Sequence, residues 1–330
     1  MKHKRNQRGF HHIALVLTIV VVAVIGLVGW RVLNKQDKSQ PSSATPTQPI
    51  IDPSKQPANS IYWDMTYVSL SDRPDKFSPG SKAVEHASVP DVIQLIKALG
   101  KYAAGDILIY YVDSAHMSGP GTENIGLVVS KDNGKTWSSG ISTRVSGKVN
   151  KGGVVDPSVV QLLDGRLRMY FFGSEVTNGD PAQQTQPHRV YSAISANGVN
   201  FTVESGIRFE ESSKLTDPEV IFWSNQWYMY YSMITETQLA VSSDGLNFTA
   251  KKVIGGSVGG VPGALAFDNG VRIYGCSQGI ATAFANDGLN FKTDGTDIVA
   301  GALCDPSAIK LADGQYLMIY KVKDPPAYAN

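Results

Sequence analysis

Short runs of alternating hydrophobic and polar residues fill most of the chain after a long apolar segment near its start. In the segment 166–171, for example, Leu167, Met169 and Phe171 fall on one face and polar or aromatic residues on the other. This period of two is typical of β-strands with two unlike faces. A helical turn over 91–99 is the one helical feature expected after the apolar segment, so the body of the chain is predicted to be all-β.

A proline that opens an apolar run recurs five times, each time followed by a turn and a second apolar run. These openings lie 67, 61, 44 and 44 residues apart, at Pro90, Pro157, Pro218, Pro262 and Pro306. Units of about 40–50 residues are typical of propeller blades. The five openings predict a five-bladed β-propeller over 61–330, closed by Ile61–Leu70 as outer strands of the last blade. A two-sheet sandwich, the alternative, gives no reason for a fivefold repeat.

The apolar segment Ile13–Trp30 is 18 residues long, carries no charge and follows four basic residues. This length and charge bias predict a transmembrane helix within 1–33 whose N-terminus is inside the cell. No small-residue cleavage site follows, which favours an uncleaved signal anchor over a removed signal peptide; a buried core helix is the alternative. The segment 34–60 contains five prolines among polar residues and is predicted to be a linker. The propeller would then lie outside the cytoplasm.

The near-neutral net charge of +1 conceals an asymmetry between the N-terminal segment and the body. Residues 1–40 hold seven of the 30 Lys and Arg and one of the 29 Asp and Glu, which leaves the body with a net charge of −5. A body with net negative charge does not indicate the basic surface that nucleic-acid binding requires. The two cysteines, Cys276 and Cys304, exclude a disulfide-dense scaffold; a disulfide between them and two free thiols both stay open. We expect a monomer.

Two motifs resemble those of known propellers. The segment Ser130–Trp137, SKDNGKTW, matches the Asp-box of sialidases, a turn in which the aspartate bonds its own backbone, so we expect a structural role for Asp132. The segment Asp156–Val159, DPSV, with the Asp-Gly and Tyr-Phe pairs that follow it, resembles blades of the five-bladed arabinanase–levansucrase–invertase superfamily of glycosidases.

This resemblance implies hydrolysis of glycosidic bonds by carboxyl groups from three blades. Asp156 matches the second-blade aspartate that stabilises the transition state or tunes the acid. The position of the first-blade aspartate falls on Val89, and the nearest carboxyl group is Asp91. The position of the third-blade glutamate falls on Thr216, and the nearby acids are Asp217 and Glu219.

Equivalent positions of a closed repeat lie at equivalent places around its axis, so the five openings should meet at one mouth of the central channel. They carry five acids, Asp91, Asp156, Asp217, Glu219 and Asp305. Crowded carboxyl groups raise one another's pKa, which can pair a protonated acid with an ionised base. Residues two apart on a strand share a face, so Asp217 and Glu219 are expected to point together.

Three interpretations of this acidic ring follow. The first is a membrane-anchored, extracytoplasmic glycoside hydrolase-like propeller with Asp91 as base, Asp156 as orienting group, and Glu219 or Asp217 as acid. The second is a non-catalytic propeller that binds surface glycan or a protein partner, and the third is a structural envelope protein without a ligand. Aspartates before proline can also serve their own backbone. No cofactor is expected, although oxygen ligands of this kind would suit a Ca²⁺ ion in the central channel.

Overall fold

The computed structural model describes residues 52–116, 124–147, 154–173, 187–211, 214–255 and 258–325. All of them belong to one compact unit, Gln48–Asn330. Within these residues, no helix has the length and apolar character needed to cross a membrane. The predicted transmembrane helix in 1–33 lies outside the described residues. Of the predicted linker, residues 52–60 are described, and they contain the short 3₁₀ helix η1 (Pro53–Lys55).

The strands form five sheets, each built around one of the proline-led segments, and every pair of strands is antiparallel except β7 (Arg144–Ser146) with β11 (Asn200–Val203). The first blade consists of β3 (Ala87–Gln94), β4 (Ile107–Asp113), β5 (Ile125–Ser130) and β6 (Ile141–Ser142). The second consists of β8 (Val154–Gln161), β9 (Leu167–Gly173), β10 (His188–Ser195) and β11 (Asn200–Val203), with β7 (Arg144–Ser146) and β12 (Phe209–Glu211) added at its edge. The third consists of β13 (Leu215–Trp223), β14 (Gln226–Met233), β15 (Glu236–Ser242) and β16 (Thr249–Gly255). The fourth consists of β17 (Gly260–Phe267), β18 (Gly270–Ser277), β19 (Gly279–Ala285) and β20 (Lys292–Gly295).

The fifth blade joins the two ends of the described chain. Its strands, from the centre outward, are β21 (Cys304–Lys310), β22 (Tyr316–Lys323), β1 (Asp64–Ser71) and β2 (Ser81–Glu85). Strand β1 pairs with β22 without interruption, from Asp64 opposite Lys323 to Ser71 opposite Tyr316. The predicted closure by the segment after residue 60 is therefore confirmed. Two further 3₁₀ turns, η2 (Ile61–Trp63) and η3 (Ser114–His116), lie beside this blade and the first.

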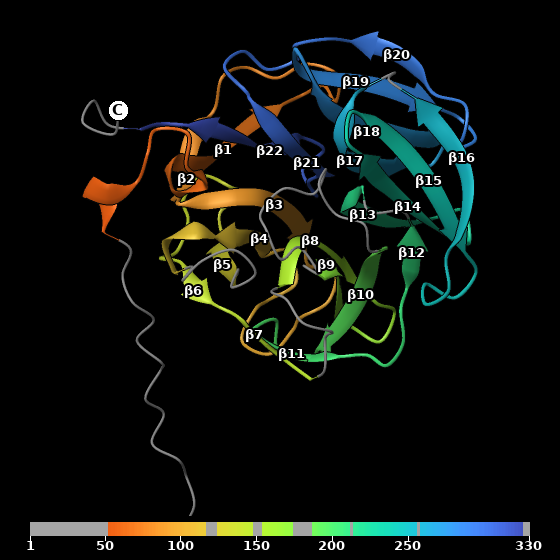
Figure 1. Cartoon of the computed structure of the whole chain (residues 1–330), viewed down its shortest axis with the longest axis horizontal. Helices are drawn as coiled ribbons and strands as arrows, with labels where there is room; N and C mark the ends of the chain where they lie inside the picture. The colour runs from red at the N-terminus through yellow and green to blue at the C-terminus, as the bar shows by residue number, and fades with distance from the viewer. Residues whose placement is uncertain are drawn as a thin grey trace, which may run out of the picture. The chain divides into compact units, whose positions relative to one another are not determined.

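The five sheets surround a common axis, with β3, β8, β13, β17 and β21 innermost (Figure 1). Each of these inner strands contacts the next, and β21 contacts β3 to complete the circle. The predicted five-bladed β-propeller is confirmed.

Each proline lies on the innermost strand, whose channel-facing edge has no neighbouring strand. Proline lacks an N–H, and the edge of a sheet is where that loss is tolerated. At each proline the pairing of the inner strand with the next strand shifts register by a bulge. After the first bulge, β3 continues as a strand to Gln94, so the helical turn expected over 91–99 is wrong. The edge position of β3 and its bulge favour a strand there, although the apolar spacing had predicted a helical turn.

Tyrosines on the second strand of three successive blades fasten each blade to the next. The hydroxyl groups of Tyr110, Tyr170 and Tyr230 donate to carbonyl oxygens in the Gly-x-x-aromatic turns of the following blades, at 2.8–3.1 Å. All three side chains are fully buried. Buried hydroxyl groups need such partners, so these three tyrosines join adjacent blades.

Candidate functional site

The five proline-led segments meet around a single small cavity at one end of the channel. It is lined by the prolines, by the residue before each of them, and by Asp91, Glu219 and Ser307. The structure thus brings together every acid predicted for the mouth. The cavity between these residues has a volume of about 20 Å³, which is close to the space for one water molecule.

The residue after each proline contacts the following blade, and we call these five residues the post-proline ring: Asp91, Ser158, Glu219, Gly263 and Ser307. Four side chains of this ring accept a backbone N–H group. Asp91 Oδ2 accepts from Val159 at 2.6 Å, and Ser158 Oγ accepts from Val220 at 2.9 Å. Glu219 Oε1 accepts from Ala264 at 3.1 Å, and Ser307 Oγ accepts from Val92 at 3.3 Å. In each pair the donor belongs to the next blade around the axis. The ring therefore links the inner strands to one another.

Gly263 interrupts this ring between the fourth and fifth blades. A Cβ atom at this position would lie 2.1 Å from the carbonyl oxygen of Pro306, so only glycine fits between the two backbones. The same pair of blades is joined instead by a disulfide between Cys276 and Cys304, whose Cα atoms are 5.2 Å apart. The disulfide left open by the sequence is present. It supplies a covalent link where the hydrogen-bonded ring has none.

The residue before each proline forms a second ring, the pre-proline ring, which consists of Val89, Asp156, Asp217, Val261 and Asp305. All five residues have a positive φ, between 42° and 56°. Positive φ is rare for non-glycine residues and costs about 1–3 kcal/mol each. Positive φ at all five positions persists only where the surrounding structure enforces it, and here the bulge and the hydrogen bonds between blades do so.

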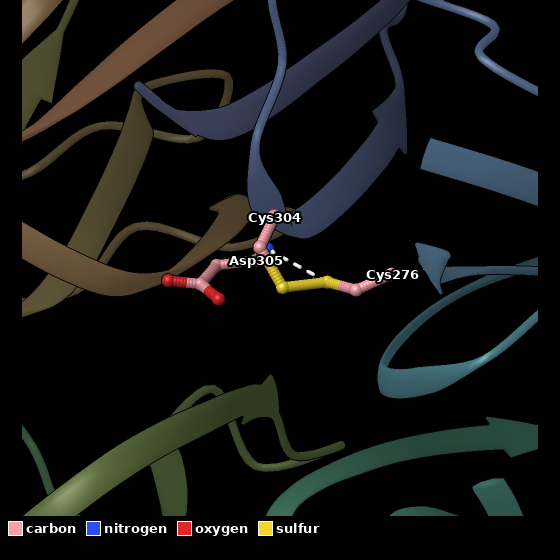
Figure 2. Close-up of side chains that lie close together, drawn as sticks. All are labelled: Cys276, Cys304 and Asp305. Carbon is pink, nitrogen blue, oxygen red and sulfur yellow. Dashed lines mark hydrogen bonds between the residues drawn. A yellow bond between two sulfur atoms is a disulfide. The ribbon is translucent and has the colours of Figure 1, made fainter. Parts of the chain in front are cut away.

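Carboxyl groups of the pre-proline ring also accept backbone N–H groups across blades. Asp156 Oδ2 accepts from the backbone of Asp217 at 3.3 Å, and Asp305 Oδ2 accepts from Val89 at 3.1 Å. Asp305 further pairs with Lys321 Nζ at 2.7 Å. Its own N–H donates to Cys276 Sγ of the disulfide at 3.3 Å, as Figure 2 shows.

Burial dominates the electrostatics of the two rings. It raises the pKa of Asp91 to about 7, against the lowering effect of hydrogen bonds from Val159 and Ser307. It also raises the pKa of Glu219 well above its usual value, with a contribution from the charge of Asp91. Two neighbouring carboxyl groups with raised pKa values are the kind of arrangement that can separate an acid from a base.

Asp217 has a different electrostatic environment. Burial raises its pKa to about 6, the hydroxyl of Thr216 lowers it by donating at 2.6 Å, and nearby Asp305 raises it again. Glu219, two residues on, bonds the fourth blade and interacts with Asp91. Asp217 and Glu219, which are expected to point together, both line the cavity but have different partners, because the bulge between Thr216 and Glu219 breaks the regular alternation of side chains along the strand.

Lys321 and Asp64 are charged groups of the mouth that sequence reasoning missed. Lys321 pairs with Asp305, while buried Asp64 pairs with Lys323 and accepts from Ser88 Oγ. Asp64 is the first residue of β1, and Lys321 lies inside β22. A lysine inside the run YLMIYKVK was the available signal, since lysine is rarely buried without a partner.

The Asp-box turn has the structural role expected of it. Asp132 accepts from the backbone N–H of Thr136 at 2.9 Å, from its hydroxyl at 2.6 Å, and from the hydroxyl of Ser130 at 2.8 Å. These bonds lower its pKa to about 2. The equivalent aspartates Asp244 and Asp287 bond their own turns in the same way.

Among the described residues, one group of three possible metal ligands lies close together, Cys276, Cys304 and Asp305. The two sulfur atoms are bonded to each other (Figure 2). Thiolates bind metals, and a disulfide offers none. We therefore propose no metal site at these three residues.

The fold is a five-bladed β-propeller that is similar to several solved structures. An α-L-arabinofuranosidase from Fusarium graminearum aligns with 81% of this chain and 95% of its own, at 12% identity and a TM-score of 0.52. An α-L-arabinanase from Penicillium chrysogenum, complexed with arabinobiose, aligns with 81% of this chain and 96% of its own, also at 12% identity and a TM-score of 0.52. A family 117 glycoside hydrolase from Zobellia galactanivorans aligns with 81% of this chain and 89% of its own, at 14% identity and a TM-score of 0.49.

No protein-family model and no curated protein sequence matches the chain. The likeness to the two structures with TM-scores of 0.52 confirms the predicted resemblance in fold. At these identities it shows the fold alone.

Proposed function

We propose that this propeller binds carbohydrate and does not hydrolyse it. The observation that carries the proposal is the engagement of the mouth carboxyl groups, which accept backbone N–H groups of neighbouring blades. A catalytic base or acid must instead reach the substrate within hydrogen-bond distance. The cavity that these residues line has a volume of about 20 Å³, far below the ~300–1,000 Å³ typical of ligand sites.

The residues at the positions implied by the glycosidase resemblance support the same proposal. Val89 occupies the position of the first-blade aspartate and Thr216 that of the third-blade glutamate. Neither can exchange a proton as a carboxyl group does. Of the three implied groups Asp156 alone is present, and its carboxylate accepts the N–H of Asp217.

Carbohydrate is the proposed ligand because solved structures with a similar fold act on carbohydrate. The two solved structures with TM-scores of 0.52 are described as an arabinofuranosidase and an arabinanase. A fold hosts many functions, so this is an argument by analogy. A protein partner is the alternative ligand.

A glycoside hydrolase is the second candidate function, and the pKa of Asp91 favours it. A value of about 7, next to the raised pKa of Glu219, is what an acid/base pair at neutral pH requires. In this candidate Asp91 is the base, Asp156 orients, and Glu219 or Asp217 is the acid.

We infer further that the propeller lies outside the cytoplasm, held to the membrane by a single span within 1–33. The disulfide between Cys276 and Cys304 supports this inference, because such bonds persist in oxidising compartments. A Ca²⁺ ion in the channel stays a prediction: Asp156 and Asp217 offer oxygen ligands, while Lys321 already neutralises Asp305.

A glycan array and a panel of oligosaccharides, both used with the full chain, test the proposal. We expect binding to a subset of glycans with no release of product. Asp156→Asn should leave that binding within about twofold, since the amide oxygen can still accept the N–H of Asp217. Release of product by the wild type, lost in Asp156→Asn, would select the hydrolase.

A further inference from the structure

A much larger cavity lies in the first blade, at the end opposite the mouth. Strand β3 leaves the mouth at Val89 and ends at Gln94, so the loop 95–106 that follows is at the far end. Strand β5 ends there too, at Ser130, and the Asp-box turn follows it. The cavity between this loop and this turn has a volume of about 580 Å³, within the range of ~300–1,000 Å³ typical of ligand sites.

Both walls of the cavity are fixed before any ligand binds. Leu99 and Tyr102 pair through two backbone hydrogen bonds of 2.9 Å, which close the loop of the first wall. In the second wall the Asp-box turn is fastened by Asp132, and Ser138 exchanges hydrogen bonds with the backbone of Val129 at 2.8 and 3.0 Å. A preformed site loses little conformational entropy on binding.

The lining combines an aromatic surface with two positive charges. Trp137 is half-buried, packs on the apolar cluster that contains Val128, and also lines the cavity. Lys101 and Lys131 line it from the two walls and are exposed. Within the described residues, neither ammonium group takes part in an ion pair.

Tyr102 adds a polar group without a partner. Its side chain is 5% exposed and lines the cavity, yet its hydroxyl makes no hydrogen bond within the described part of the chain. Burial raises its pKa, as does the charge of Asp106, so the hydroxyl stays protonated and can donate. A buried hydroxyl group without a partner costs free energy.

We infer that this cavity binds an acidic saccharide, with a sugar ring on Trp137 and its carboxylate or sulfate group held by Lys101 and Lys131. The inference rests on the proposed carbohydrate-binding function and gives it a place and a ligand class. Amphipathic rings such as Trp combine apolar contact with a polar edge, which suits the faces of a sugar. The two lysines select for negative charge, whereas the acidic mouth would repel it.

Titration of the full chain with a uronic acid oligosaccharide, a sulfated oligosaccharide and a neutral oligosaccharide of equal length tests the site. The Lys101→Gln/Lys131→Gln variant should lose about tenfold or more in affinity for the acidic ligand and change little for the neutral one. Lys135→Gln, on the same turn but outside the cavity, is the matched control and should bind as the wild type does. Comparing the carboxylated and sulfated ligands identifies the anion.

Tryptophan fluorescence provides a second readout that does not depend on the lysines. Binding should alter the emission of the wild type, and Trp137→Phe should remove that change while thermal unfolding stays cooperative. Equal loss in Lys135→Gln, or acidic ligand binding that none of the cavity variants weakens, would overturn the site and leave carbohydrate binding intact. Absence of binding to every saccharide would overturn both, and product release would overturn only the non-catalytic function.

Discussion

Replacing Asp91 with asparagine should stabilise the propeller at neutral and alkaline pH. The carboxyl group of Asp91 is 5% exposed, and burial raises its pKa from 3.8 to about 7. A group whose pKa is raised on folding binds more protons in the native state, so its ionisation costs stability as the pH rises from about 4 to 7. The cost is complete above pH 7, where a shift of this size corresponds to about 4 kcal/mol.

The amide that this substitution introduces can keep the link to the second blade, because its oxygen can accept the N–H of Val159. The hydroxyl of Ser307, which donates to Asp91 Oδ1 at 2.8 Å, loses its acceptor, at a cost of about 1 kcal/mol. Asp91→Asn should therefore gain about 3 kcal/mol at pH 8 and lose about 1 kcal/mol below pH 4. Urea unfolding of both proteins between pH 4 and 8 measures the difference.

A control of opposite sign is Asp132→Asn, because the hydrogen bonds of the Asp-box turn lower the pKa of Asp132 to about 2. Its charged form stabilises the fold above about pH 4, and that contribution disappears as the pH falls toward 2. Asp132→Asn should thus lose stability at pH 7 and approach the wild type at low pH. Parallel curves for wild type and Asp91→Asn across the whole range would refute the reasoning about Asp91.

Three further substitutions test the contacts between blades. Gly263→Ala should lower the free energy of unfolding by about 2 kcal/mol or more, seen as a lower melting temperature, since its Cβ would lie 2.1 Å from the Pro306 carbonyl oxygen; an unchanged melting temperature would contradict this. Replacing Cys276 and Cys304 with serine should cost about 3–4 kcal/mol in urea unfolding, as expected for a bridge spanning 28 residues, and no loss would contradict the bridging role. Tyr170→Phe should cost about 1–3 kcal/mol because a buried carbonyl group loses its donor; a loss near zero would place that carbonyl in contact with water.

The sequence predicted where the acids lie better than it predicted which partners their carboxyl groups have. The repeat of Pro90, Pro157 and the three later prolines predicted both the number of blades and the meeting of the acids, because symmetry transfers position from one repeat to the next. It could not predict which partner each carboxyl group has. For Asp91, Asp156, Glu219 and Asp305 those partners include backbone N–H groups, such as that of Ala264 for Glu219, which leave no trace in residue identity.

The different partners of Asp217 and Glu219 have a similar physical origin. Alternation along a strand assumes regular pairing, and a bulge adds a residue that reverses the faces beyond it. The sequence signal for that bulge was the proline itself, which cannot donate to a strand ladder. The cavity of the first blade escaped prediction for another reason, since Lys101 and Trp137 come from segments that only the fold brings together.

In the proposed function, the acids at the mouth join the blades and perform no chemistry. The rate of reducing-end release from a saccharide that the chain binds, measured between pH 5 and 8, tests this most directly. We predict no release above background at any pH, for the wild type and for Asp91→Asn and Glu219→Gln alike. A bell-shaped pH profile in the wild type that either substitution abolishes would contradict the account.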